Sequence, residues 1–151
     1  MDNARLIQKF YASFAIGDAE AMVGCYADDI EFQDPAFGPL KGNDAKNMWR
    51  MLSKTPDIEI TASNIKADDK TGSADWLAIY TFSLTGRKVI NHISATFEFK
   101  DGKINKHTDH FSFYKWARQA FGLKGWLLGW TPLMQNKVRE QALARLGRFK
   151  G

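Results

Sequence analysis

The sequence predicts an α+β fold in which a curved antiparallel sheet and three N-terminal helices form a cone-shaped barrel around a pocket, followed by a C-terminal helical extension. Three observations lead to this prediction. Apolar residues recur at helical spacing up to Pro56, they alternate at strand spacing from there to Phe113, and turn sequences separate the alternating runs. A length of 151 residues suits one domain with a single substantial core.

Three amphipathic helices are expected in the first third of the chain. The first covers about residues 3–16 and ends at Gly17, where a residue with left-handed backbone conformation is typical. Asp18 caps the second helix, and Asn43 or Asp44 caps the third. The apolar face of the first helix consists of Leu6, Phe10 and Phe14, and that of the third of Ala45, Met48, Trp49 and Leu52.

A short strand, residues 30–34, is expected between the second and third helices, and four longer strands follow the third. These four are about residues 58–63, 76–84, 91–99 and 103–113, with turns at 68–72, 85–86 and 101–102. Strands joined by such short turns run antiparallel, so the four form a meander. Three helices packed on its concave side would close the cone.

Asp34 is the unusual residue of the short strand, because it shares the apolar face of that strand with Ile30 and Phe32. Loss of hydration raises the pKa of a carboxyl group, and an acid whose pKa is near neutrality suits general-base catalysis. The alternative is structural, since an Asp before a proline, here Pro35, favours a turn. This stretch alone does not decide between the two.

The inner wall of the sheet is expected to combine polar and aromatic side chains. In the last strand, side chains alternate between the two faces of the sheet, so an inward Phe111 places His107 and Asp109 on the inner face as well. In the strand before it, Asn91 is the one polar residue on the apolar face. A bulge or a slip of one residue would exchange the faces. Such a pocket suits a flat apolar ligand, and its expected binding residues are Phe10, Phe14, Trp76, Tyr80, Phe82, Asn91, Phe97 and Phe111.

The candidate catalytic residues are therefore Asp34, His107 and Asp109. An apolar wall raises the pKa of a carboxylate and lowers that of an imidazole, whereas a close Asp–His pair shifts both in the opposite sense. Either arrangement supplies an acid and a base for moving a proton next to a carbonyl. The alternative is that His107 and Asp109 bond each other or the backbone and only complete the core. We favour a function, because burying several charges without use is costly.

Neither a metal nor a cofactor is expected. A His and two carboxylates could form a facial triad for non-haem iron, but Asp34 is far in sequence from the His-x-Asp pair. The sequence lacks a Gly-rich phosphate loop, zinc-ligand spacing and a nucleophile elbow. Its one cysteine, Cys25, fits a buried inert thiol in a reducing compartment, and the N-terminus shows no signal-peptide pattern, so we expect a cytoplasmic protein.

Residues 114–151 form a basic, Trp-rich extension to the domain of residues 1–113, with eight Lys or Arg against one acid, Glu140. Thr131 and Pro132 open a helix with a narrow apolar stripe. Such a segment could lie in a membrane interface. We favour packing over the pocket mouth or across a homodimer interface, because the stripe is narrow. Nucleic acid is not an expected partner, since the body of the chain is mildly acidic.

The sequence resembles the nuclear transport factor 2-like superfamily, which includes ketosteroid isomerase and the SnoaL-like polyketide cyclases. The resemblance rests on the Gly17-Asp18, Tyr26-Ala27-Asp28-Asp29 and Gln33-Asp34-Pro35 segments. It extends in order of elements over about residues 3–113. It implies the cone fold and a homodimer formed through the outer face of the sheet.

The resemblance also implies roles for individual residues. In ketosteroid isomerases the aspartate before that proline is the general base, and Asp34 falls on it. The two positions that form the oxyanion hole of ketosteroid isomerases resemble the positions of Phe10 and Ala95 in this sequence. Neither side chain can donate a hydrogen bond. His107 and Asp109 fall on last-strand positions that line the pocket of these relatives. SnoaL-like cyclases use an aspartate as acid and base without a cofactor, whereas the superfamily's limonene epoxide hydrolases use an Asp, Arg, Asp set, for which no inward Arg is evident.

Two functions follow from the sequence. One is cofactor-free acid–base chemistry on a small hydrophobic carbonyl compound, as an isomerisation, cyclisation or dehydration. The other is a non-catalytic protein that binds a small hydrophobic molecule, with or without a membrane surface. The superfamily contains both classes, so the fold does not choose between them.

Overall fold

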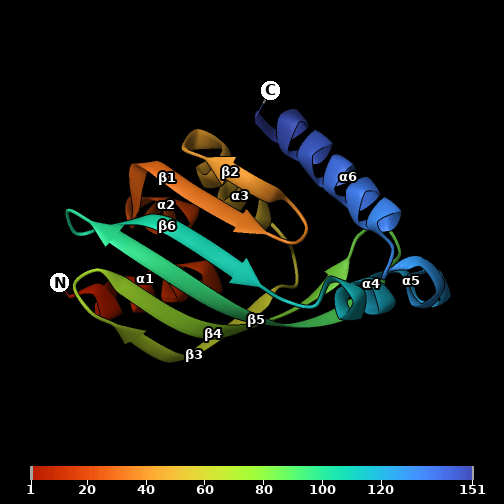
Figure 1. Cartoon of the computed structure of the whole chain (residues 1–151), viewed down its shortest axis with the longest axis horizontal. Coiled ribbons are helices and arrows are strands. Elements are labelled where there is room, and N and C mark those ends of the chain that lie inside the picture. The colour runs from red at the N-terminus through yellow and green to blue at the C-terminus, as the bar shows by residue number, and fades with distance from the viewer. Residues whose placement is uncertain (1, 151) are drawn as a thin grey trace.

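The computed structural model describes residues 2–150 and consists of one six-stranded sheet with helices on one face and at one end (Figure 1). The helices are α1 (Asn3–Ala15), α2 (Ala19–Gly24), α3 (Asn43–Leu52), α4 (Phe113–Phe121), α5 (Leu123–Leu128) and α6 (Pro132–Lys150). The strands are β1 (Tyr26–Asp34), β2 (Gly38–Lys41), β3 (Glu59–Ala67), β4 (Thr71–Phe82), β5 (Arg87–Lys100) and β6 (Lys103–His110).

The sheet has the strand order β2-β1-β6-β5-β4-β3. Strands β3 to β6 form the predicted antiparallel meander, and β1 joins it by pairing in parallel with β6. The helices α1, α2 and α3 lie behind the sheet in Figure 1, and no helix of residues 2–150 covers the opposite face. The curved sheet stays open, with β2 and β3 at its edges. The prediction of an α+β cone with three N-terminal helices is confirmed.

The ends of the helices follow local sequence signals. The carboxylate of Asp18 accepts a hydrogen bond from the backbone of Ala21 at the start of α2, as predicted. Gly17 has φ +76°, a conformation that glycine adopts without steric cost. The α3 cap was predicted wrongly, because Gly42, and not Asn43 or Asp44, precedes the first helical residue.

Several segments differ from the sequence prediction, and the first is the short strand, which starts at Tyr26 and not at Ile30. The last strand ends at His110 and not at Phe113, because Ser112 accepts a hydrogen bond from the backbone of Lys115 and starts α4. The short strand β2 was not predicted, since Pro39 lies within it and β2 is an edge strand that pairs only with β1. Helix α4 was not predicted because the last strand was extended over its start, and α5 was not predicted because glycines interrupt the apolar pattern from Gly122 to Gly129.

Buried apolar side chains form two clusters. The main core lies between α1–α3 and the inner face of the sheet, and contains Phe10, Phe14, Phe32 and Trp49 among others. The end cluster fills the end of the sheet beneath the C-terminal helices. Its members are Val89, Phe113, Trp116, Ala117, Ala120, Met134 and Val138. Tyr80 and Phe111 pack against both clusters and therefore mark the boundary between them.

The C-terminal helices pack on the rest of the molecule. Helix α4 packs against β5, and α6 runs back along the molecule to α3 (Figure 1). Leu146 of α6 belongs to the main core, and the ammonium group of Lys150 pairs with the carboxylate of Asp44. Among residues 2–150, no helix combines the length and the apolar character that crossing a bilayer requires.

Candidate functional site

The parallel pairing of β1 with β6 brings the candidate catalytic residues into one region. In this pairing Phe32 lies beside His107, and Gln33 lies beside Thr108. The end of β1, with Asp34, therefore approaches the end of β6, with Asp109. Both His107 and Asp109 are buried on the inner face, whereas their neighbour His110 is exposed on the outer face. The register shift between β5 and β6 falls earlier in β6, where Ile104 is also buried.

His107 is the centre of a buried hydrogen-bond network. The distance from its Nδ1 atom to the hydroxyl of Tyr26 is 2.7 Å, and that from its Nε2 atom to Oδ1 of Asp109 is 2.9 Å. The indole of Trp49 donates to the Tyr26 hydroxyl at 2.7 Å, and the indole of Trp76 donates to Oδ1 of Asp109 at 3.3 Å. The network thus joins α3 to β1, β6 and β4.

The donors of this network determine where its hydrogens lie. An indole N–H can only donate, so the Tyr26 oxygen accepts from Trp49 and is free to donate its own hydrogen to Nδ1 of His107. In this arrangement Nε2 of His107 carries a hydrogen and donates it to Asp109. The imidazole is therefore held between a donor and an acceptor, and His107 and Tyr26 together fix the orientation of the Asp109 carboxylate.

Aromatic rings enclose the imidazole of His107, which has no exposed surface. The ring of Phe97 lies 4.5 Å from it between centroids, and the indole of Trp49 stacks on it at 5.9 Å. Phe10 approaches it edge-on at 5.6 Å. Phe14 packs farther out, against Trp49 and Trp76. Of the predicted ligand-binding residues, Phe10, Phe14, Trp76 and Phe97 are thus buried around the network.

Three of the other predicted ligand-binding residues, Tyr80, Phe82 and Phe111, pack against the end cluster. Phe82 contacts Trp116 and Phe121, and the hydroxyl of Tyr80 accepts a hydrogen bond from the indole of Trp116 at 2.8 Å. Phe111 packs against both clusters. Asn91 is buried on β5 opposite Ala78. Seven of the eight predicted residues thus belong to or pack against one of the two clusters, and Asn91 lies beside Ala78 of the main core.

Asp34 ends β1 and is half-buried. Its Oδ1 atom accepts hydrogen bonds from the backbone N–H groups of Ala36 at 2.9 Å and Phe37 at 2.6 Å. Burial removes water from the carboxylate and raises the pKa of Asp34 to about 7, and the negative charge of Asp109 contributes in the same direction. The turn hydrogen bonds and the charge of Arg139 oppose this rise. Asp34 thus caps its turn and also has the pKa of a general base at neutral pH.

The raised pKa of Asp34 predicts a specific pH dependence of stability. The native state holds this proton more tightly than the unfolded chain, in which the pKa is near 3.8. The contribution of Asp34 to the free energy of unfolding is therefore greatest below pH 4 and is lost as the pH rises to 7. The full shift corresponds to roughly 4 kcal/mol, of which roughly 2 to 3 kcal/mol is lost between pH 5 and pH 8.

Urea denaturation of the native chain and of Asp34→Asn at pH 5 and pH 8 tests this prediction. Hydrogen bonds lower the pKa values of three other acids, Glu20, Asp57 and Asp68, so their contribution to the free energy of unfolding changes with pH in the opposite direction. This contribution is the same in both proteins and cancels when the two free energies are subtracted. Relative to the native chain, Asp34→Asn is expected to be more stable at pH 8 than at pH 5 by roughly 2 to 3 kcal/mol. If the difference in free energy of unfolding between the two proteins is the same at pH 5 and pH 8, the pKa of Asp34 in the native state is close to its value in the unfolded chain.

The three candidate catalytic residues do not form one hydrogen-bonded triad. His107 and Asp109 are bonded to each other, but no hydrogen bond among residues 2–150 joins either of them to Asp34. The link between Asp34 and Asp109 is electrostatic. Within the same residues no three His, Cys, Asp or Glu side chains are grouped as metal ligands, so the facial triad considered from the sequence is not assembled.

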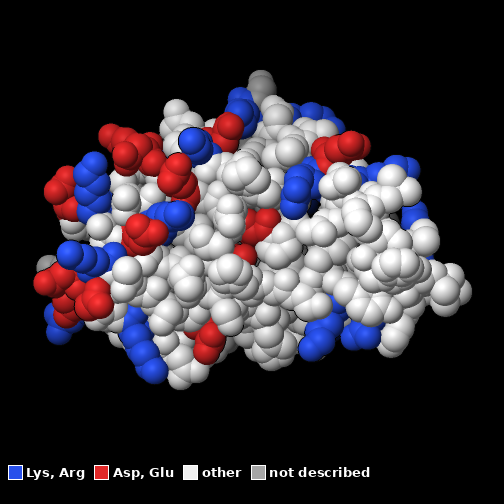
Figure 2. Space-filling view, viewed as in Figure 1, with Lys and Arg blue, Asp and Glu red and all other residues white. Residues whose placement is uncertain are grey.

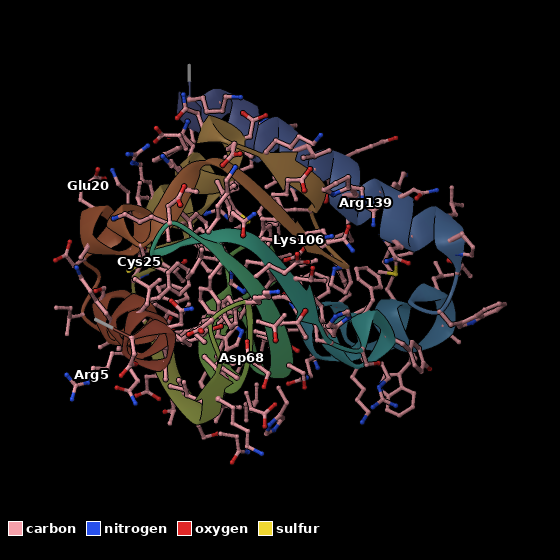
Figure 3. All side chains as sticks on the ribbon, turned by 60° about the vertical axis from the view of Figure 1, so that its left-hand side comes forward. Arg5, Glu20, Cys25, Asp68, Lys106 and Arg139 are labelled. Carbon is pink, nitrogen blue, oxygen red and sulfur yellow. The ribbon has the colours of Figure 1, made fainter. Side chains whose placement is uncertain are left out.

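Sequence reasoning missed Arg139 of α6 as a neighbour of Asp34. The Arg139 guanidinium donates to the carbonyl of Pro35 at 3.3 Å, and Gln135 donates to the same oxygen at 3.0 Å. Figure 3 shows Arg139 on α6, next to the end of β1. A side chain added at Gly38 would meet this guanidinium at 3.0 Å. The contact joins residues about a hundred positions apart, and no sequence pattern indicated it.

Tyr11 and Tyr26 are two further polar residues that the sequence did not single out for the site. Burial raises the pKa of both phenols, and the charge of Asp109 raises both further. The Tyr26 hydroxyl belongs to the network, whereas the buried Tyr11 hydroxyl makes no hydrogen bond to any described residue. Asp109 is therefore within electrostatic reach of both Asp34 and Tyr11.

Because the hydroxyl of Tyr11 is unpaired among residues 2–150, we expect its removal not to destabilise the protein. Tyr11→Phe is expected to leave the free energy of unfolding unchanged or to raise it by up to about 1 kcal/mol, because a buried hydroxyl without a partner costs stability. The matched control, Tyr26→Phe, removes a hydroxyl with two partners and is expected to cost about 2 kcal/mol. Urea denaturation measures both. Equal losses in the two variants would mean that the Tyr11 hydroxyl is paired in the native protein.

Two hollows, of about 780 and 420 Å³, lie on the outer face of the sheet. The larger is lined by exposed side chains of β5 and β6, including Thr96, Glu98 and Lys106, the last of which is labelled in Figure 3. The smaller lies over β3, β4 and β5 and includes His92. Neither is lined by Asp34, His107 or Asp109. The enclosed pocket predicted from the sequence stays a prediction.

Comparisons with known proteins agree with this architecture. A 1.30 Å crystal structure of a nuclear transport factor 2-like protein of unknown function from Burkholderia pseudomallei has a TM-score of 0.69 and 16% identity, covering 81% of this chain and 100% of that one. A hypothetical protein with a ketosteroid isomerase-like fold from Catenulispora acidiphila has a TM-score of 0.68 and 15% identity, covering 84% and 97%.

An LEH-like epoxide hydrolase from M. tuberculosis has a TM-score of 0.65 and 18% identity, covering 82% of this chain and 91% of that one. Identities this low show a shared fold. The search of curated proteins gave no match. The sequence model of the SnoaL-like domain matches residues 7–107, a range that runs from α1 to His107. The chain therefore belongs to the SnoaL-like domain family.

Proposed function

We propose that this protein performs cofactor-free acid–base chemistry on a small hydrophobic carbonyl compound, with Asp34 as the general base. The observation that carries the proposal is the pKa of about 7 at Asp34, in a half-buried position next to a core of aromatic side chains. At neutral pH about half of such carboxyl groups are ionised. Asp34 can therefore accept a proton from a weakly acidic carbon and return it without a cofactor.

The proposed ligand site is the boundary between the main core and the end cluster. Asp34 lies there, and its charge contributes to the raised pKa of Tyr80, which is half-buried at this boundary. Phe111 supplies a second aromatic surface in contact with both clusters. A flat apolar ligand between these rings would present its carbonyl side to polar groups at the end of β1.

In the reaction, Asp34 removes a proton from the carbon next to the carbonyl, and the electrons of the broken C–H bond form an enolate. Return of the proton to another carbon gives an isomerisation. Attack of the enolate carbon on a second carbonyl closes a ring, and the alkoxide that forms takes the proton from Asp34. Loss of a neighbouring hydroxide, which takes the same proton and leaves as water, gives a dehydration. In each case Asp34 ends the cycle as it began, so no oxidant or reductant is needed.

His107 and Asp109 act as positioning groups in this scheme. Asp109 raises the pKa of Asp34 by its charge, and His107 holds the Asp109 carboxylate by donating to its Oδ1 atom. The Tyr11 hydroxyl, unpaired within the described residues and near Asp109, is available to donate to the developing oxyanion. The similarity to an LEH-like epoxide hydrolase supports an enzyme on this fold. The homodimer expected from the resemblance also stays a prediction.

Deuterium exchange into a set of simple ketones tests the proposed proton abstraction directly. A panel of cyclic and aromatic ketones is incubated in D₂O with the protein, and ¹H NMR follows loss of the proton next to the carbonyl. We expect catalysed exchange for at least one ketone, with a rate that rises with pH through an inflection near 7. Ketones that quench tryptophan fluorescence but show no catalysed exchange at any pH would instead favour the binding protein.

A further inference from the structure

The C-terminal extension presents an apolar surface that the fold leaves uncovered. We call it the apolar tip, and it consists of the exposed side chains of Leu123, Trp126, Leu127, Leu128, Trp130 and Leu133. Leu127 and Trp130 are 63% and 70% exposed. Helix α5 lies at the extreme right-hand end of the molecule in Figure 1, beyond the sheet. The tip is thus a projecting apolar surface, and no described residue covers it.

Glycines on the inner side of this segment turn the large side chains outward. A side chain at Gly125 would come within 2.0 Å of the carbonyl oxygen of Ala117 in α4, and one at Gly129 within 2.8 Å of the Ala117 side chain. Only glycine permits this approach. Because the glycines occupy the side of the segment that touches α4, Leu127 and Trp130 are left on the other side, and Trp126 lies at the edge of this contact.

Specific contacts hold the tip in this exposed arrangement. The hydroxyl of Tyr114 donates to the backbone carbonyl of Trp126 at 2.9 Å, and the guanidinium of Arg118 lies 4.2 Å from the Trp126 ring. The indole of Trp130 donates to the carbonyl of Leu127 at 3.0 Å. The backbone at the tip is therefore fixed.

The segment that carries the tip, residues 114–139, has cations as its only charged side chains. Lys115, Lys124 and Lys137 are exposed, and no Asp or Glu occurs in residues 114–139. Figure 2 shows this end of the molecule as mostly uncharged atoms with Lys and Arg along its edges. A second copy docking tip to tip would bring like charges together. Anionic lipid head groups would complement the same charges, while tryptophan and leucine suit the interfacial layer of a bilayer.

We propose that the apolar tip binds the interfacial layer of an anionic lipid bilayer, with the exposed lysines of this segment contacting the head groups. The sequence indicates a candidate membrane-binding segment made of the Trp- and Leu-containing stretch together with the narrow apolar stripe of the basic helix that follows it. In the structure Met134, Val138 and Leu146 of that stripe are buried, so they are not available to lipid. The tip itself lies before the stripe. The proposal is independent of the acid–base reaction.

Vesicle co-sedimentation of the full chain tests the proposal. The probes are phosphatidylcholine vesicles and vesicles of phosphatidylcholine with phosphatidylserine. We expect binding to the second kind, weakened by salt and accompanied by a blue shift of tryptophan fluorescence. Leu127→Gln with Trp130→Gln is expected to lower the affinity about tenfold or more, because two interfacial apolar groups are lost. The matched control, Ile16→Gln, changes an apolar residue that is 80% exposed at the end of α1 and leaves binding unchanged.

A second variant keeps the test decisive if the first one misfolds. Replacing Lys115, Lys124 and Lys137 by Gln removes cations without touching an apolar contact, and it is also expected to weaken binding by about tenfold or more. Absence of binding to anionic vesicles would overturn the proposal, as would equal binding by native chain and tip variant. A third outcome also contradicts the proposal: neither the native chain nor the tip variant binds vesicles, and light scattering shows that only the native chain self-associates. That result would assign the apolar tip to contact with a second copy of this chain.

Discussion

Replacing Asp34 by Asn is expected to lower the rate of catalysed proton exchange by at least about a hundredfold, the usual contribution of a general base. Asn matches Asp in shape, and its side-chain oxygen can still accept the turn hydrogen bonds from Ala36 and Phe37. The substitution therefore removes the proton acceptor and leaves the turn in place. Ligand affinity, measured by quenching of tryptophan fluorescence, is expected to change little.

The control for this experiment is Asp29→Asn, which removes a carboxylate that is exposed on the same strand. It is expected to keep the native exchange rate. If Asp34→Asn also keeps that rate, Asp34 is only the cap of its turn. A large loss of thermal stability in Asp34→Asn, with a parallel loss of ligand affinity, would likewise assign Asp34 a structural role.

Replacing His107 by Gln is expected to lower the free energy of unfolding by about 3 kcal/mol and the melting temperature by about 9 °C. The imidazole bonds two groups on opposite sides, Tyr26 and Asp109, and it has no exposed surface. The shorter reach of the amide leaves at least one of them buried without its partner. The carboxylate is the more costly of the two to leave unpaired.

His110→Gln is the matched control, because His110 lies three residues later on the same strand and faces outward. Its effect on the free energy of unfolding is expected to stay within about 0.5 kcal/mol, as is usual at the surface. Urea denaturation at pH 7 compares the two variants. Similar small changes in both would show that the network around His107 contributes little to stability.

The sequence was sufficient for the parts of the fold that depend on local pattern. Helical spacing identified α1 and α3, and the Asp101-Gly102 turn, with φ of +54° and +75°, identified the hairpin between β5 and β6. The parallel pairing of β1 with β6 was not predicted, because it joins residues about seventy-five positions apart. Helix α5 was missed because its glycines serve a close helix contact, which periodicity does not reveal.

The candidate site shows the same division between local and distant information. Strand alternation was enough to place His107 and Asp109 together on the buried face of β6, and an acid on an apolar face was enough to single out Asp34. Tyr11 and Arg139 could not be found in this way. Their proximity to the two carboxylates depends on how α1 and α6 pack against the sheet, a property of the folded chain that no spacing rule encodes.

The most direct test of this account is a pH titration of the Asp34 side chain by ¹³C NMR, with the carboxyl resonance assigned by comparison with Asp34→Asn. We expect an inflection near pH 7, because the half-buried carboxyl is poorly hydrated and lies near Asp109. Such a value would mean that the protein holds a base matched to neutral pH. An inflection near pH 4 would contradict the account and leave Asp34 as the cap of its turn.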